Sequence, residues 1–330
     1  MRYPQTRLQR YRQSPTLRTL FAEHTLRPEC CIQPLFIHEG LSEARPIGSL
    51  PGMVQHSLSS LSLEIEILWD AGVRGVLLFG IPTEKDLTGS HASDETGILQ
   101  RSIRQIKTQC PDMTVIADCC LCEYTSHGHC GILTPTPATF DHEATLTHLG
   151  EIALSYAHAG VDIIAPSGML DGMIQHLRST LDTHAFTHTL LMSYAVKYAS
   201  SFYGPFRDAA GSGEVFSGNR KHHQMAYTQR KEALREAQLD EQEGADILMV
   251  KPGMPYLDIV SDIRRNTHLP VAVYQVSGEY AMLHAAAKAG VFQYEAAMLE
   301  SLMGFVRAGA HWIITYDAKR VRELIHPLLG

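Results

Sequence analysis

The chain has 330 residues, 45% of them hydrophobic, and a formal net charge of -7 at pH 7. This composition suits a folded protein with a large core and excludes a disordered or fibrous chain. An acidic chain offers no basic face to nucleic acid, so we expect a small-molecule partner. No run of about 18 or more apolar residues occurs, and the first residues lack an apolar segment, so we expect neither a membrane span nor a secretory signal.

The first thirty residues differ in composition from the rest. Several arginines precede the first acidic residue, Glu23, which is also typical of an organelle transit peptide. Apolar residues are interspersed among these arginines, as is common at protein interfaces. These apolar residues are Tyr3, Leu8, Tyr11, Leu17, Leu20 and Phe21. We therefore expect residues 1–30 to form an extended arm that contacts a neighbouring subunit.

Eight short apolar runs follow, with helical patterns between them. They are residues 33–37, 75–79, 114–118, 163–165, 189–193, 246–250, 271–276 and 312–315. Each run is nearly continuous in Val, Ile and Leu, as in parallel strands covered on both faces. Four runs follow a small residue and a glycine that would end a helix, as in "AGVDIIA" and "EGADILMV".

These repeated units predict the fold class α/β, with a single (β/α)8 TIM barrel over residues 31–330. In such a barrel the active site lies at the C-terminal ends of the strands. A doubly wound open sheet is the alternative, but no Gly-rich phosphate-binding segment follows the first strand.

Two lysines stand at predicted strand ends. Lys251 directly follows the run "DILMV", and Lys197 lies four residues beyond Ser193. A lysine buried at the mouth of an apolar barrel has a lowered pKa and can form a Schiff base with a carbonyl group. The alternative for either residue is a solvated lysine that attracts an anionic group.

The segment "ADCCLCEYTSHGHCG" contains four cysteines and two histidines. In a reducing compartment, which we expect to be the cytoplasm, such a cluster indicates metal or catalytic residues rather than disulfides. Cys120, Cys122 and Cys130 have the pattern of a catalytic zinc site with an open fourth position. Cys119 should point away from Cys120 and Cys122 if the strand continues. The alternatives are a cluster of buried thiols, or a site in which the two histidines take part.

The chain resembles the porphobilinogen synthase (5-aminolevulinate dehydratase) family of the zinc-using type. The resemblance is carried by "CLCEYTSHGHCG", "SFYGPFRDAAGS", "LMVKPGMPYLDI" and "YQVSGEYAM", and related spacing extends from near residue 5 to the C-terminus. It implies a lyase that condenses two 5-aminolevulinate molecules to porphobilinogen with loss of two waters, in tetrapyrrole and heme biosynthesis. It also implies a homo-octamer.

The resemblance further assigns site residues. Lys251 would form the Schiff base with the first substrate and Lys197 one with the second, while Cys120, Cys122 and Cys130 would bind Zn²⁺.

Other assignments concern the substrate carboxylates and a second metal. Ser277 and Tyr316 would bind the carboxylate of the first substrate, and Arg207 and Arg220 that of the second. Glu236 would hold a hydrated allosteric Mg²⁺ between subunits.

The chain departs from the family pattern at three positions. His223 and Tyr227, in "RKHHQMAY", replace a tyrosine and a proline, and Gly168 stands where many relatives have Asp. Two other classes of protein are alternatives. A class I aldolase would need one Schiff-base lysine and no zinc, which the cysteine triad argues against. A non-catalytic zinc protein with the same barrel would have no need of the two lysines.

Overall fold

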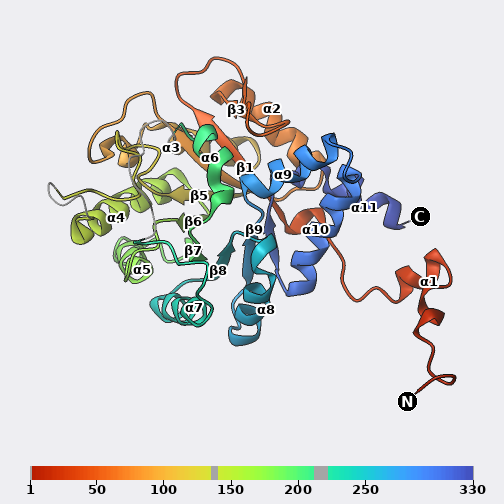
Figure 1. Ribbon diagram of the computed structural model, residues 1–330. Helices are drawn as coiled ribbons and strands as arrows, with labels where there is room; N and C mark the ends of the chain where they lie inside the picture. Colours follow the sequence, from red (N-terminus) through yellow and green to blue (C-terminus); the bar gives the residue numbers. More distant parts are fainter. Residues whose placement is uncertain (1, 135–139, 212–221, 330) are drawn as a thin grey trace.

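The computed structural model describes residues 2–134, 140–211 and 222–329, with side chains as far as residue 326. Eight parallel strands are hydrogen-bonded in chain order, and the last pairs with the first, which closes the barrel (Figure 1). All eight predicted runs are strands, and the predicted (β/α)8 barrel is confirmed. The strands are β1 (Cys31–His38), β4 (Gly75–Ile81), β5 (Thr114–Cys119), β6 (Ile163–Pro166), β7 (Leu190–Lys197), β8 (Ile247–Lys251), β9 (Val271–Tyr274) and β10 (Trp312–Ile314).

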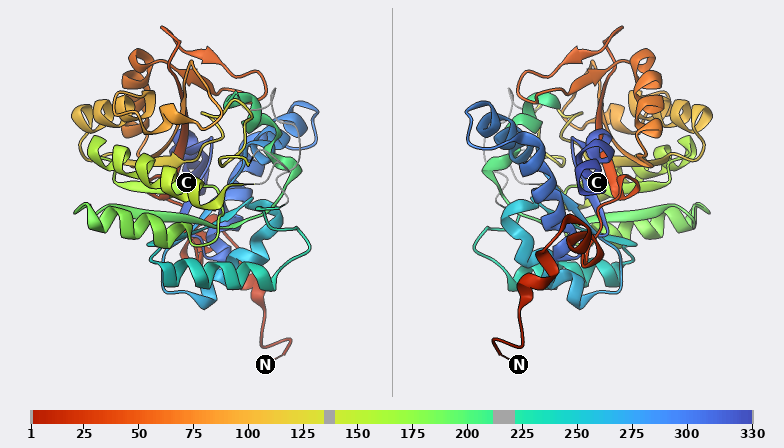
Figure 2. Two further views of the ribbon diagram at one scale, coloured as in Figure 1. Left: turned by 90° about the vertical axis from the view of Figure 1, so that its left-hand side faces the viewer. Right: turned by 90° about the vertical axis from the view of Figure 1, so that its right-hand side faces the viewer.

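Helices surround the strands, as the two views in Figure 2 show. Most residues of the eight barrel strands are buried. A short helix, α6 (Gly204–Ala209), follows β7 and lies at the C-terminal ends of the strands. The longer helices are α2 (Leu58–Asp70), α3 (Ile98–Gln109), α4 (His142–Ala159), α5 (Met173–Thr183), α7 (Lys231–Glu243), α8 (Leu257–Asn266), α9 (Ser277–Lys288), α10 (Tyr294–Ala308) and α11 (Val321–Leu329).

The glycines that the sequence placed at helix ends have left-handed backbones. Gly72, Gly160, Gly244 and Gly309 follow α2, α4, α7 and α10 with φ of +92°, +92°, +103° and +107°. Residues with a Cβ rarely adopt this conformation, whereas glycine does so without steric cost. Each glycine ends its helix and directs the chain into the next strand.

Two β-pairings were not predicted. β2 (Arg45–Pro46) and β3 (Val54–His56) form a small antiparallel ribbon, and β3 continues the sheet beside β1, with Phe36 paired to Gln55. The ribbon contains no continuous apolar run, because β2 is exposed and the buried residues of β3, Gln55 and His56, are polar. A search for apolar runs therefore missed it.

The N-terminal segment extends away from the barrel (Figures 1 and 2). It contains a short 3-10 helix (Leu8–Arg12) and α1 (Pro15–Leu20), and Tyr11 packs on Phe21 with ring centroids 4.6 Å apart. Several of its large apolar side chains are exposed, among them Tyr3 and Leu20 at 74% each. Within the parts of the chain that the structure describes, no helix combines the length and apolarity needed to cross a bilayer.

Candidate functional site

The two predicted lysines lie side by side at the barrel mouth. Lys197 ends β7 and Lys251 ends β8, and the two residues are paired in the register of these parallel strands. Both are buried, at 5% and 6% exposure. The ammonium group of Lys197 donates a hydrogen bond to the backbone carbonyl of Ser167 at 2.6 Å.

Aromatic rings surround the Lys251 amine. Its Nζ lies 4.3 Å from the ring centroid of Tyr274, 4.9 Å from that of Tyr194 and 5.3 Å from that of Phe206. Burial, together with the neighbouring Lys197, lowers the pKa of Lys251 from 10.5 to about 7. The Lys251 amine is therefore neutral in a large fraction of the molecules near pH 7. The neutral amine is the form that attacks a carbonyl carbon.

Asp118 is a site residue that our sequence analysis did not assign. It lies near the end of β5, is 6% exposed, and accepts a hydrogen bond from the Ser167 hydroxyl at 3.3 Å. Burial and the nearby Glu123 raise its pKa to about 8, although Lys251 and Lys197 act in the opposite direction. A carboxyl group that exchanges its proton near neutral pH is suited to general acid and base catalysis. Its position at a strand end was the signal that could have identified it.

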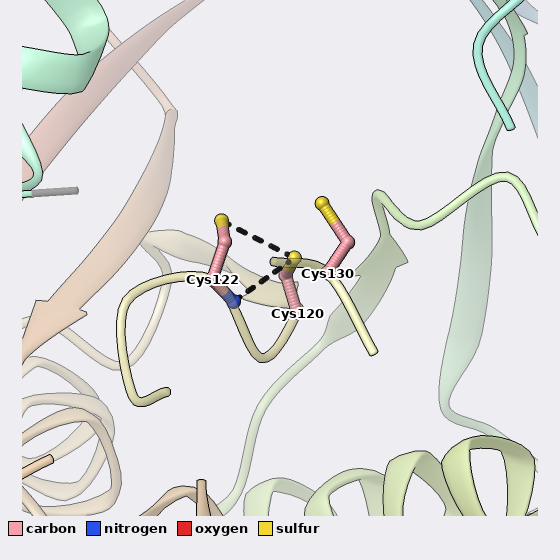
Figure 3. A group of neighbouring side chains, drawn as sticks. All are labelled: Cys120, Cys122 and Cys130. Carbon is pink, nitrogen blue, oxygen red and sulfur yellow. Dashed lines mark hydrogen bonds between the residues drawn. The ribbon is translucent and has the colours of Figure 1, made fainter. Parts of the chain in front are cut away.

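The three predicted metal-binding cysteines come together in the segment after β5. Cys120, Cys122 and Cys130 are buried in a cluster of their own, separate from the main core. The Sγ atoms of Cys120 and Cys122 are 3.3 Å apart, and all three sulfurs lie within 4.8 Å of one another. Figure 3 shows the three side chains turned toward a common region. Hydrogen bonds from Cys120 and Cys130, together with burial, hold the pKa of Cys122 well above its usual value, so this thiol is protonated until a cation displaces the proton.

The cysteine cluster adjoins the lysine pair through Asp118. Asp118, Cys120 and Glu123 form a second buried group whose ligand atoms lie within 4.8 Å of one another. The Cys122 thiol donates to the Glu123 carboxylate at 3.1 Å. The site therefore places soft sulfur ligands, a buried carboxyl group and two amines in one continuous buried region.

Cys119 and the two nearby histidines are not part of this cluster. The Cys119 side chain packs in the main core, apart from Cys120 and Cys122, with its Sγ 3.7 Å from the carbonyl oxygen of Leu149. It points away as expected, although β5 ends at Cys119 and the strand does not continue to Cys122. The Nε2 atom of His127 is hydrogen-bonded to the carbonyl of Leu87, and its Nδ1 atom accepts a hydrogen bond from the backbone N–H of His129. Among the described residues, neither histidine belongs to a group able to hold a metal.

Ser277 and Tyr316 lie on the side of the lysine pair nearer to β9 and β10. The Ser277 hydroxyl accepts from the backbone N–H of Phe206 at 2.9 Å and donates to the carbonyl of Phe202 at 3.3 Å. The Tyr316 hydroxyl is 3.4 Å from that of Tyr274, whose ring faces the Lys251 amine. Both predicted residues are thus linked to the surroundings of Lys251.

The predicted arginine pair is only partly described. Arg207 is half-buried on α6, a helix held at the mouth by Phe206, whose ring lies 5.7 Å from Phe36 and 5.0 Å from Phe79. Arg220 lies outside the described residues.

Glu236 lies on α7, outside the ring of strands. It lines two neighbouring cavities, of about 100 Å³ and about 400 Å³, together with Asp171. The smaller cavity is also lined by Asp240, whose carboxylate accepts a hydrogen bond from the Ser193 hydroxyl of β7. Burial and then the negative charge of Asp171 raise the pKa of Glu236, as expected where acidic groups gather.

The three departures from the expected pattern have different settings. Tyr227 is 73% exposed, and the ring of His223 packs on Phe140 with centroids 5.1 Å apart. A Cβ added at Gly168 would meet Met173 Sδ at 3.5 Å, an ordinary contact, so the backbone there leaves room for a side chain.

Comparison with known proteins gives a consistent result. The sequence model of the family described as delta-aminolevulinic acid dehydratase matches residues 5–324. The delta-aminolevulinic acid dehydratase of Helicobacter pylori is 50% identical over 320 residues, which is 97% of this chain and 98% of that protein. The Escherichia coli protein of the same name is 47% identical over 317 residues, or 96% of this chain and 97% of that one.

A solved structure agrees with the fold over almost the same range. The crystal structure of the Toxoplasma gondii enzyme, in complex with its reaction product porphobilinogen, superposes with a TM-score of 0.94 at 39% identity. The match covers 96% of this chain and 91% of that one.

Proposed function

Because the chain belongs to the delta-aminolevulinic acid dehydratase family, we propose that it condenses two 5-aminolevulinate molecules to porphobilinogen with loss of two waters. It is therefore an enzyme of the lyase class. The observation that carries the proposal is the buried pair Lys197 and Lys251 beside the cluster of three thiols.

Lys251 is the nucleophile for the first substrate. Its neutral Nζ attacks the ketone carbon, an N–C bond forms, and the ketone oxygen leaves as water to give an imine. The lowered pKa of Lys251 supports this role, since a fully protonated amine has no lone pair for attack. Lys197 forms a second imine with the second substrate in the same way. Asp118 lies within 4.8 Å of the Cys120 sulfur and shares Ser167 as a hydrogen-bond partner with Lys197, so it can supply and remove the protons that these steps require.

The donor set at the cysteine cluster fits zinc. Zn–S bonds of about 2.3 Å in a tetrahedron place sulfurs about 3.8 Å apart, which small side-chain shifts from the present spacing would reach. Cys120, Cys122 and Cys130 would hold the ion and leave the fourth position open. When bound, Zn²⁺ acts as a Lewis acid on the second substrate.

Four residues are proposed to hold the substrate carboxylates. Ser277 and Tyr316 bind that of the first substrate, which requires the Ser277 hydroxyl to turn its proton from the Phe202 carbonyl toward the ligand. Arg207 and Arg220 bind that of the second, because a guanidinium group can donate two parallel hydrogen bonds to a carboxylate.

Glu236 is proposed to bind an activating Mg²⁺. A hydrated Mg²⁺ needs few protein oxygens and room for its waters, and the acidic cavities beside Glu236 supply both.

The proposed assembly is a homo-octamer, in which the exposed apolar residues of the arm contact neighbouring barrels. The proposed location is the cytoplasm. Its support is that all seven cysteines are described and are free thiols, as a reducing compartment would keep them.

The deciding experiment is reductive trapping. The enzyme is incubated with 5-aminolevulinate, treated with borohydride, digested and mapped by mass spectrometry, while a parallel assay measures porphobilinogen. We expect an adduct on Lys251 and formation of the product. An adduct on a residue other than Lys251, or the absence of porphobilinogen, would contradict the proposal.

A further inference from the structure

A buried carboxylate lies between the turn after Lys251 and the start of α9. Glu279, the third residue of α9, is 0% exposed. One of its oxygens accepts from the backbone N–H of Met254 at 2.6 Å. The other accepts from the N–H of Val276 at 2.5 Å and, more weakly, from that of Gly253 at 3.4 Å. Three backbone donors therefore meet at one side chain.

The turn after Lys251 relies on these bonds. Pro252 has no N–H, so the first backbone donors beyond Lys251 are those of Gly253 and Met254, and both are directed to Glu279. On its other side, the carbonyl of Lys251 accepts from the N–H of Tyr198 on the chain leaving β7. Glu279 is thus the anchor of this turn on the side of β9 and α9.

The same carboxylate fixes the segment that carries Ser277. Val276 immediately precedes Ser277, whose hydroxyl accepts from the Phe206 N–H on α6. The start of α9 also approaches the chain after β7 closely, because a Cβ added at Gly278 would meet the Phe202 carbonyl oxygen at 2.5 Å. One side chain therefore connects the Lys251 turn with the position of Ser277.

The chemistry of the contact requires a carboxylate. Burial raises the pKa of Glu279 to about 7, while the three N–H groups lower it, so the charged form is maintained by these bonds. An amide of the same shape offers one acceptor oxygen and would turn its NH₂ group toward at least one N–H donor, which leaves a buried donor unsatisfied.

We propose that Glu279 is a positioning residue of this enzyme, which sets the Lys251 amine relative to Ser277 so that the imine carbon and the substrate carboxylate are held at a fixed separation. This rests on the proposed function, in which Lys251 forms the imine and Ser277 binds the carboxylate. Glu279 itself is fully buried, and its hydrogen bonds are with the backbone N–H groups of Gly253, Met254 and Val276, which flank Lys251 and Ser277 in the chain.

The test compares Glu279→Gln with a control, Asp246→Asn, at the end of β8 that is remote from Lys251. Asp246 stands just before β8, and its carboxylate accepts from the backbone N–H of Leu191 at 2.8 Å. Asp246→Asn therefore also changes a carboxylate that binds a backbone N–H, but far from the barrel mouth. Unfolding temperature, zinc content, kcat, KM and the rate of borohydride trapping of 5-aminolevulinate are measured for both variants at a pH of about 8, above the pKa of Glu279.

We expect both variants to lose some thermal stability and to keep their zinc. Only Glu279→Gln should trap substrate on Lys251 more slowly, by about tenfold or more, with kcat falling further than KM rises, because a small misplacement of reacting groups slows the chemical step most. If Glu279→Gln traps substrate as fast as wild type, or no more slowly than Asp246→Asn, the inference is wrong.

Two further outcomes are also decisive. If Glu279→Gln does not fold, Glu279→Asp takes its place: its shorter side chain cannot span both segments, so trapping at the wild-type rate would overturn the inference. If wild type itself gives no adduct on Lys251, the proposed function fails, and the inference fails with it. An adduct in wild type with equal trapping in the variants rejects the inference alone.

Discussion

Lys197 and Lys251 are paired residues on adjacent parallel strands, and each is the last residue of its strand. Burial, and then the positive charge of the neighbouring Lys197, lowers the pKa of Lys251. The pairing therefore keeps one amine ready for attack, while the second is held by the carbonyl of Ser167.

Replacement of Lys251 separates charge from nucleophilicity. Lys251→Arg keeps a cation but cannot form the imine at neutral pH, so porphobilinogen formation should fall by about three orders of magnitude or more, with the fold intact. Steady-state assays and circular dichroism would check this. Activity near that of wild type would exclude Lys251 as the nucleophile.

Lys251 should also lower stability in a pH-dependent way. Its pKa is about 7 in the folded chain and 10.5 ordinarily, so between these values the unfolded chain binds a proton that the folded chain lacks. Stability therefore rises with pH through this window, and the cost of burying Lys251 is greatest at or below pH 7. Lys251→Met should raise the unfolding temperature near pH 7 by about 2 °C or more. The gain should shrink toward pH 9 in calorimetry, and a gain that grows with pH would contradict the assigned shift.

The cysteines should differ in their effect on zinc. Cys122→Ala removes one ligand of a three-thiolate site, so dialysed protein should lose its tightly bound zinc and nearly all activity. Cys119→Ala is the control, because its side chain packs in the core, and it should lose neither. Elemental analysis decides the matter: a Cys122 variant that retains full zinc occupancy would show that the ligands are wrongly assigned.

Asp118→Asn should affect both proton transfer and the Lys251 amine. Loss of a general acid and base lowers kcat by about 10²- to 10⁴-fold. Because the Asp118 carboxylate raises the pKa of Lys251, its removal should lower that pKa below about 7. The midpoint of the pH dependence of borohydride trapping should therefore move to lower pH. An unchanged or raised midpoint would mean that Asp118 does not act on Lys251.

Magnesium should act through Glu236 without affecting the reaction site. Glu236→Ala should abolish stimulation by Mg²⁺ in activity titrations while zinc content and Lys251 trapping remain at wild-type levels. Glu323→Ala, which removes an exposed acid on α11, is the control and should still respond. Continued stimulation of the Glu236 variant would place the magnesium elsewhere.

Removal of residues 1–25 should produce smaller and poorly active particles. The arm exposes its apolar side chains and makes its ring contact, Tyr11 on Phe21, within itself. Light scattering on the truncated chain gives the particle mass, and the full-length chain is the reference. An octamer that survives truncation would show that the arm is dispensable for assembly.

The barrel could be predicted because its strands are buried on both faces. Such strands must be apolar throughout, and their order along the chain is their order in the sheet, so eight runs were enough to infer the architecture. Strand ends then pointed to Lys197 and Lys251 before any tertiary contact was known. The ribbon of β2 and β3 was not predicted, because a short segment at the edge of the sheet has no continuous apolar run in its sequence.

The remaining site residues depend on contacts between distant segments. The strand-end position of Asp118 can be read from the sequence, but its raised pKa depends on burial and on the charge of Glu123 in the folded chain. Glu279 resembles an ordinary acid in the first turn of a helix until its three backbone partners are seen. A single sequence does not reveal such convergence, because the partners come from different units of the barrel.

The irregularity in the pairing of β7 with β8 has a consequence for the tolerance of this strand to change. From Ser193 to Val196 the chain takes three steps, while its partners on β8, Leu248 and Val250, are two apart. Side chains alternate between the two faces of a regular strand. The one surplus residue on β7 therefore moves every later side chain of that strand to the opposite face from the one that regular alternation would give it. This is how Tyr194 and Lys197, an odd number of positions apart, both come to face the barrel interior. A one-residue deletion between them would remove the surplus residue and restore regular pairing, so Lys197 would follow Tyr194 by two positions and still face the interior. In a strand without the irregularity, the same deletion would turn the lysine outward.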